Sequence, residues 1–170
     1  MLNRAVAALK QGKEPDLTQP LGIATEINLH IPALLPNDYA PDVHERLSLY
    51  KRLANCEQAE EIEALQEELI DRFGELPPQA QSLLATHRVR LLVKPYCVAK
   101  LDATSEQIVV QFSADFAKDA PIEPIRIINL IQKNRNYRLA GQDRLLFTRH
   151  TPSLGERVAA IRELFKELTG

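Results

Sequence analysis

The spacing of hydrophobic and polar residues changes along the chain, and each spacing predicts a type of element. Residues 25–32, TEINLHIP, alternate between apolar and polar side chains and end in a proline. A period of two is typical of a half-buried strand, so a strand is predicted here. Strands are also predicted at residues 98–103, 107–112, 136–140 and 144–149. The short connections at 104–106 and 140–143 favour antiparallel hairpins.

Apolar residues three or four positions apart predict helices in the intervening segments. The first helix is expected to begin near Pro41 and to place its apolar face at Val43, Leu47, Tyr50 and Ala54. Further helices are predicted from Pro77 and Pro78 to about Leu92, at about 123–134, and from Leu154 to about Leu168, with Val158, Ile161, Phe165 and Leu168 on the buried side of the last one.

One more helix precedes that at Pro77 and contains the stretch EELIDRFGELP, residues 67–77. Its apolar stripe is expected to consist of Ile62, Leu65, Leu69 and Phe73. Gly74 is expected to end the helix in the left-handed conformation. Asn55 is expected to cap its start, with Gln58 bonding back to the backbone in a capping box.

Together these elements predict an α+β fold, a small, mostly antiparallel sheet packed with a helical subdomain. MLNRAVAALK at the start also has helical spacing, and the polar residues 11–22 are expected to be a connector. A native protein seldom begins in mid-helix without a cap, so this start indicates a fragment of a longer chain.

The composition is that of a soluble globular domain, with 45% hydrophobic and 26% charged residues in 170. An apolar run of the roughly 18 residues needed to span a bilayer is absent, which excludes a membrane protein. Cys56 and Cys97 lack metal-ligand spacing and favour a reduced, cytoplasmic location over a disulfide between them. Cys56, expected at a helix N-terminus, is interpreted as a buried thiol rather than a reactive one.

Charge is distributed unevenly along the chain although the net charge is only −2. Residues 42–75 contain ten acids and four bases, and residues 126–149 contain six bases and one acid. Such a distribution favours oriented docking, within the molecule or with a partner, over nonspecific binding of nucleic acid.

Sequence motifs for catalysis or metal binding are missing. The sequence has no GxxxxGK[ST] phosphate loop, no HExxH or CxxC pair and no GxSxG elbow, and its four histidines are scattered singly. We therefore predict no catalytic residue, no metal site and no cofactor in this chain, and do not expect it to be an enzyme.

Arginines and interleaved aromatic residues in the last third of the chain raise a second hypothesis. Arginines next to Tyr137 and Phe147 can grip single-stranded nucleic acid. The alternation in YRLA and RLLFTR instead places arginines on the solvated face of a sheet, the interpretation that we favour. The alternative function is a nucleic-acid-binding accessory domain that uses Arg126, Arg135, Arg138, Arg144 and Arg149.

The charged residues of EELIDRFGELP allow three interpretations. At about 100° per residue, Glu68, Asp71 and Arg72 fall on the side of the helix away from the apolar stripe. Spacing alone favours a solvated face with a Glu68–Arg72 ion pair. A catalytic carboxylate pair would need an apolar pocket, which nothing in the sequence indicates. A surface for an arginine-rich partner is the stronger functional alternative.

Two long segments add a family resemblance. INLHIPALLPNDYAPDVHERLSLYKRLANC, followed by EELIDRFGELP, resembles the C-terminal domain of the bacterial transcription-repair coupling factors (Mfd). The resemblance covers nearly the whole chain, including YRLAGQDRLLF. It implies that residues 1–22 are the tail helix of a preceding motor domain with its connector, and that residues 23–170 are the regulatory domain.

The resemblance also implies a function. Proteins of this family are ATP-dependent double-stranded DNA translocases that use ATP and Mg²⁺, release stalled RNA polymerase and recruit excision repair through UvrA. Their C-terminal domain masks the N-terminal UvrA-binding module of the same protein, with contacts that correspond here to Glu68, Asp71 and Arg72. This chain has no helicase motif, so the resemblance does not carry the motor activity onto it, and such motifs are expected before residue 1.

Overall fold

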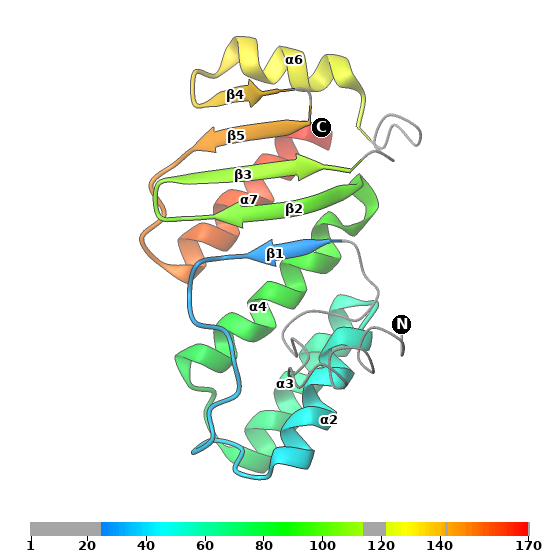
Figure 1. Cartoon of the computed structure of the whole chain (residues 1–170), viewed down its shortest axis with the longest axis vertical. Coiled ribbons are helices and arrows are strands. Elements are labelled where there is room, and N and C mark those ends of the chain that lie inside the picture. Colours follow the sequence, from blue (N-terminus) through cyan, green and yellow to red (C-terminus); the bar gives the residue numbers. More distant parts are fainter. Residues whose placement is uncertain (1–24, 114–121, 142, 170) are drawn as a thin grey trace, which may run out of the picture. The chain divides into compact units, whose positions relative to one another are not determined.

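The computed structural model describes residues 25–113, 122–141 and 143–169 (Figure 1). The helix and connector predicted over residues 1–22 lie outside these ranges. The described chain divides into two compact units: residues 32–88 form a helical unit, and residues 25–31 together with the chain from Val89 onward form a unit built on a sheet. The predicted α+β class is confirmed.

The helical unit contains helices α2 (Val43–Asn55) and α3 (Ala59–Phe73) and the first part of α4 (Pro78–Val93). Their inward-facing residues supply much of its core, namely Leu49 and Leu53 from α2, Ile62, Leu65 and Leu69 from α3, and Ala80, Leu83 and Leu84 from α4. The three helices predicted between Pro41 and Leu92 are therefore confirmed.

Helix α2 buries only part of the predicted face, since Tyr50 is buried, Leu47 and Ala54 are half-buried, and Val43 is exposed. Its N-cap is Asp42, whose side chain accepts a hydrogen bond from the backbone N–H of His44. Val43 is 54% exposed, while Leu49 and Leu53 are fully buried. Two leucines four residues apart define a stronger apolar stripe than the predicted one, so the helix turns them inward.

Helix α3 confirms the predicted stripe and its end but not its start. Gly74 ends the helix as predicted, and its N–H donates to the carbonyl of Ile70, but with φ +93° and ψ −165° it adopts a positive-φ conformation other than the predicted left-handed one. Asn55, the predicted cap, is instead the last residue of α2, and α3 begins after Gln58, whose side chain makes no capping bond. Phe73 is half-buried and packs against Tyr39, with 5.5 Å between ring centroids.

The second unit holds, within the described residues, a five-stranded sheet in the order β1-β2-β3-β5-β4. Its strands are β1 (Glu26–Asn28), β2 (Val98–Ala103), β3 (Gln107–Phe112), β4 (Tyr137–Ala140) and β5 (Arg144–Thr148). Only the β1–β2 pair is parallel, so the predicted mostly antiparallel sheet and both hairpins are confirmed. The unit also contains the 3₁₀ turn η1 (Lys94–Tyr96) and helices α6 (Pro124–Lys133) and α7 (Leu154–Thr169).

Strand β1 is shorter than the predicted strand over residues 25–32. It ends at Asn28, and His30 two residues later has φ +55°, a left-handed conformation that interrupts the extended backbone. The side chain of Asn28 accepts a hydrogen bond from the N–H of His30 at 2.9 Å and stabilises this turn.

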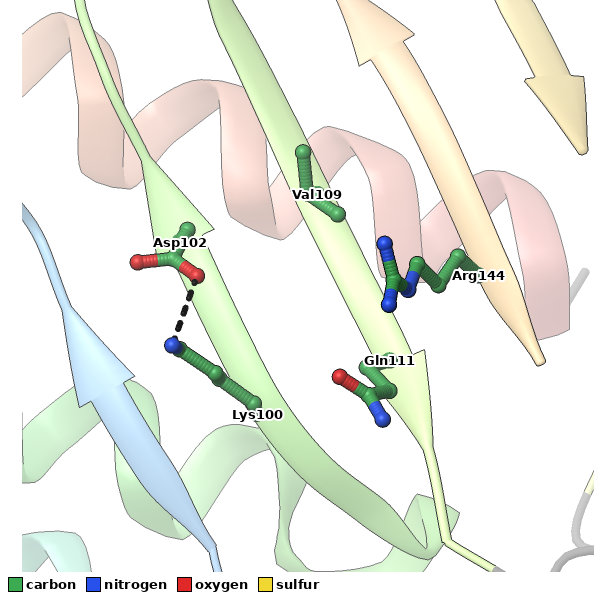
Figure 2. A pocket seen from close by; sticks show the side chains of 5 residues that line it. All are labelled: Lys100, Asp102, Val109, Gln111 and Arg144. Atoms are coloured by element: carbon green, nitrogen blue, oxygen red, sulfur yellow. Dashed lines mark ion pairs between the residues drawn. The ribbon is translucent and has the colours of Figure 1, made fainter. Parts of the chain in front are cut away.

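The two faces of the sheet differ in character. Residues of one face are apolar, and α7 runs across that face in Figures 1 and 2. Helix α7 buries Ile161, Phe165 and Leu168 as predicted, whereas Val158 is only half-buried. The apolar residues of the sheet on this face are Leu101, Ile108, Val110, Leu145 and Phe147. The opposite face bears polar and charged side chains.

A buried arginine on α7 was not foreseen from the sequence. Arg157 is 4% exposed, and its guanidinium donates to the carbonyl oxygens of Leu29 at 2.7 Å and Thr151 at 2.6 Å. Its Nε also lies 3.3 Å from the hydroxyl of Thr151. These bonds connect the segment after β1 to the start of α7 and satisfy the buried charge with dipoles.

We expect Arg157→Ala to lower the free energy of unfolding by about 2–4 kcal/mol, because it leaves two buried carbonyl groups without donors and opens a cavity. Urea unfolding at neutral pH measures this loss. Arg162→Ala, an exposed position on the same helix, is the matched control and is expected to change stability by less than about 0.5 kcal/mol. Equal effects of the two variants would show that the Arg157 bonds do not stabilise the fold.

Candidate functional site

Helix α3 places the three predicted docking residues on one side. Leu65 and Leu69 point into the core of the helical unit, so the residues at Glu68, Asp71 and Arg72 turn outward. Asp71 and Arg72 are exposed, and the side chain of Glu68 retains 36% of its accessibility. The structure therefore brings the predicted residues together as expected.

Glu68 lies between two guanidinium groups. Arg52 of α2 donates to both carboxylate oxygens, at 2.5 and 2.9 Å, in a forked arrangement. Arg72 approaches the same carboxylate at 3.3 Å, one helical turn away on α3, and also pairs with Glu45 of α2. We call these four residues the α2–α3 network. Sequence spacing revealed the Glu68–Arg72 pair but not the contribution of α2.

Hydrogen bonds from Arg52 hold the pKa of Glu68 below its ordinary value and raise that of Arg52. A general acid needs the opposite shift, a pKa raised toward neutrality. The hypothesis of a catalytic carboxylate pair therefore finds no support in this geometry. Since both side chains are more than one-third exposed, solvent limits the ion pair to about 0.2–1 kcal/mol.

Asp71 differs from its two neighbours in the motif. It is exposed, and within the described part of the chain its carboxylate has neither an ion pair nor a hydrogen bond. All of its acceptor capacity is open to water. A partner's arginine can therefore engage Asp71 without displacing a bond within the domain.

The five arginines of the alternative nucleic-acid site do not share a surface. Arg138 on β4 is opposite Leu146 of β5, and Arg144 on β5 is opposite Ala140 of β4. Opposite residues of paired strands share a face, as do residues two positions apart in one strand, so both arginines lie on the polar face of the sheet. Arg149 follows β5 on the other side and pairs with Glu163 of α7 at 2.9 Å. The remaining two, Arg126 on α6 and Arg135 before β4, are exposed.

The expectation that the strand arginines all lie on one solvated face of the sheet was wrong, because Arg149 lies on the side of α7. The sheet places Arg138 and Arg144 together, and this pair is what remains of the nucleic-acid hypothesis as a coherent surface.

Cys56 is not at a helix N-terminus as expected. It is the C-cap of α2, is 6% exposed, and its thiol donates to the carbonyl of Arg52 at 3.2 Å. The negative end of the helix dipole disfavours a thiolate there. The interpretation as a buried thiol is confirmed, and neither Cys56 nor Cys97 forms a disulfide.

Two general properties bear on function. In residues 25–113, 122–141 and 143–169, no cluster of three or more His, Cys, Asp or Glu side chains is arranged to hold a metal ion. Nor does the described part of the chain contain a helix long and apolar enough to cross a membrane.

Comparison with known proteins identifies the family. The TRCF domain family matches residues 29–122, more than half of the chain and the part that contains α3. The chain belongs to the TRCF domain family. The resemblance that its two long motifs predicted is confirmed.

Relatives and a solved structure agree with this assignment. The TRCF chain is 38% identical over 169 residues to the transcription-repair-coupling factor of Escherichia coli (strain K12) and 39% identical to that of Haemophilus influenzae. Each alignment covers 99% of this chain but 14% of the relative, so the chain spans about one-seventh of their length.

The fold matches a crystal structure of the C-terminal domain of a transcription-repair coupling factor. The TM-score is 0.68, and the match covers 85% of this chain and 91% of the other at 24% identity. At this identity the likeness establishes that the two chains share a fold.

We expect Glu68→Gln to lower the free energy of unfolding of the TRCF chain by about 0.5–1 kcal/mol at neutral pH. The folded-state pKa of Glu68 is depressed, so its stabilising effect is present above the ordinary carboxyl pKa and is lost as the pH falls through the depressed value. Urea unfolding from pH 7 down to about pH 3 should show the two proteins converging.

Glu63→Gln on the same helix is the control, because Glu63 is exposed and lies about one and a half turns earlier, outside the α2–α3 network. This variant should match the wild type at every pH. A Glu68→Gln effect that stays constant to the lowest pH would mean that side-chain packing, not charge, stabilises the α2–α3 contact.

Proposed function

We propose that this chain is the non-catalytic regulatory domain at the C-terminus of a transcription-repair coupling factor. In this proposal residues 23–170 form the domain, and residues 1–22 are the tail helix and connector of a preceding motor domain. The domain docks through Glu68, Asp71 and Arg72 on the N-terminal UvrA-binding module of the same protein and keeps that module masked. Family membership and the intact ELIDRFG motif support this proposal.

The proposal assigns the remaining activities to other parts of the same protein. The whole protein would be a cytoplasmic, ATP-dependent translocase on double-stranded DNA that uses ATP and Mg²⁺, releases stalled RNA polymerase and recruits nucleotide excision repair through UvrA. The relatives, named transcription-repair-coupling factors, are about seven times longer than this chain, which leaves room in them for other domains.

The observation that carries the proposal is the contrast within the motif. Glu68 and Arg72 are held in place by α2, and Asp71 beside them has its acceptor capacity open. Side chains that are already ordered lose less conformational entropy when a partner binds. The surface thus combines a pre-organised pair with one uncommitted carboxylate, which suits a partner surface that presents arginines.

Charged contacts of this kind suit a reversible lock. At a solvated rim they orient the partner and speed association more than they add affinity. A masked state held by a few kcal/mol can be opened by another ligand that prefers the unmasked state. Connection within one protein raises the effective concentration of the two surfaces, so a weak contact is sufficient.

Asp71→Ala is expected to weaken binding of this chain to the separately expressed UvrA-binding module by about tenfold, or ~1.4 kcal/mol, without lowering the free energy of unfolding, because alanine is the better helix former. The carboxylate contributes nothing to the fold that its removal would disturb, so the loss falls on docking. Calorimetric titration at low and moderate salt measures it, and wild-type binding should weaken as salt is added.

Glu63→Ala is the matched control on the same helix and should bind like the wild type. The titration is repeated with the two parts joined by a flexible linker, so that a contact too weak to measure between separate molecules is still detected. Equal binding by Asp71→Ala and Glu63→Ala, or linked proteins that show no docking, would overturn the proposed surface.

A further inference from the structure

The polar face of the sheet contains a hollow that the docking proposal does not use. It has a volume of about 170 Å³ and is lined by Lys100, Asp102, Val109, Gln111 and Arg144. In Figure 2 these side chains lie on the opposite side of the sheet from α7, and Arg144 reaches from β5 toward Gln111 on β3. The hollow belongs entirely to the sheet unit.

The acidic residues on this face already have partners. Asp102 pairs with Lys100 at 3.6 Å, drawn as a dashed line in Figure 2, and with His30 at 3.1 Å. Lys100 also lies 3.5 Å from Glu26 on β1. On the β1–β2 side of the hollow, Lys100 is thus committed to two carboxylates and has no charge left for a partner.

The arginines on the β5–β4 side differ from Lys100 in this respect. Arg138 and Arg144 are exposed, and in the part of the chain that the structure describes neither has a carboxylate within ion-pair distance. Arg149, just past the end of β5, shows the contrast, because Glu163 satisfies it. Strand register places Arg138 and Arg144 diagonally on one face, about 7–8 Å apart at the backbone.

Beside these arginines lie an amide and an apolar floor. Gln111 is directly opposite Arg144 in the β3–β5 register, so its side-chain amide adds a neutral hydrogen-bonding group. Val109 and Leu146 are also opposite each other, and Leu146 is only 9% exposed although it lies on the polar face. Its neighbours on that face include Arg138 and Arg144, whose aliphatic stems can shield apolar surface in this way.

We propose that this face is a second interaction surface, which takes an acidic side chain of a protein partner. The carboxylate enters the hollow at the end opposite Asp102, whose charge Lys100 offsets, and accepts hydrogen bonds from the Arg144 guanidinium and the Gln111 amide. Arg138 adds a second positive charge, and the methylene groups of the ligand side chain contact Val109. The volume suits one glutamate or aspartate side chain.

A protein carboxylate fits this surface better than the phosphates of a nucleic acid. A strand long enough to use both arginines and continue across the sheet would meet the carboxylates of Asp102 and Glu26. Favourable contact with a polyanion needs a continuous basic track. A single carboxylate needs one arginine fork and a neutral donor.

The proposal is independent of docking through α3, because it concerns residues of the other unit. The probe is a capped hexapeptide with a single glutamate among glycine and serine residues, titrated into the isotopically labelled full chain and followed by nuclear magnetic resonance. We expect saturable shifts of the Gln111 side-chain amide and the Arg144 Nε–H. Arg144→Gln should weaken binding of the peptide by about tenfold, the effect of losing one charge-assisted bidentate contact.

Arg149→Gln is the matched control, since it removes the same charge at the end of the same strand but on the other face. It should leave peptide binding unchanged, and circular dichroism of both variants verifies that they fold. Equal weakening by the two variants would reveal nonspecific attraction and overturn the site. So would an absence of saturable shifts, or tighter binding by a thymidine hexanucleotide than by the peptide, the outcome expected of a nucleic-acid surface.

Discussion

Glu68 accepts hydrogen bonds from a forked arginine on the neighbouring helix, and this pairing determines which charges of the helical unit remain for a partner. Arg52 and Arg72 converge on one carboxylate, and Glu45 shares Arg72, so four side chains fix α2 against α3 at their solvated edge. A carboxylate has a limited number of acceptor sites. A partner that binds Glu68 therefore competes with Arg52, whereas one that binds Asp71 competes only with water.

The arginines of the sheet unit also differ in whether they already have partners within the domain. Arg157 is buried, and carbonyl and hydroxyl oxygens satisfy it, so it acts as a connector between β1 and α7. Arg149 is committed to Glu163. Arg138 and Arg144 extend from the face that α7 leaves open, with no carboxylate in reach among the described residues. These four arginines, which look alike in the sequence, thus differ because of strand alternation and because a helix packs on one side of the sheet.

The spacing of apolar residues correctly predicted the elements that depend mainly on their own sequence. The stripe of α3 and its glycine stop follow from helical spacing, and β2 and β3 follow from a period of two. The failures occur where distant contacts or backbone conformation prevail. The left-handed φ of His30 ends β1 early. The buried Leu49 and Leu53 of α2 are a different case, because their helical spacing was visible in the sequence and was given too little weight. Arg157 did leave a signal, since it falls in helical register with the buried Ile161, Leu164 and Leu168.

At the candidate site, spacing correctly placed Glu68, Asp71 and Arg72 on one side of α3, but it could not supply Arg52, sixteen residues away on another helix. That missing partner changes the energetics of the proposed lock. When the domain undocks, Glu68 and Arg72 keep or regain their partners on α2, so the open state carries no orphaned charge in the network. In the proposed lock this removes one cost of opening, so a ligand that prefers the open state has less free energy to supply.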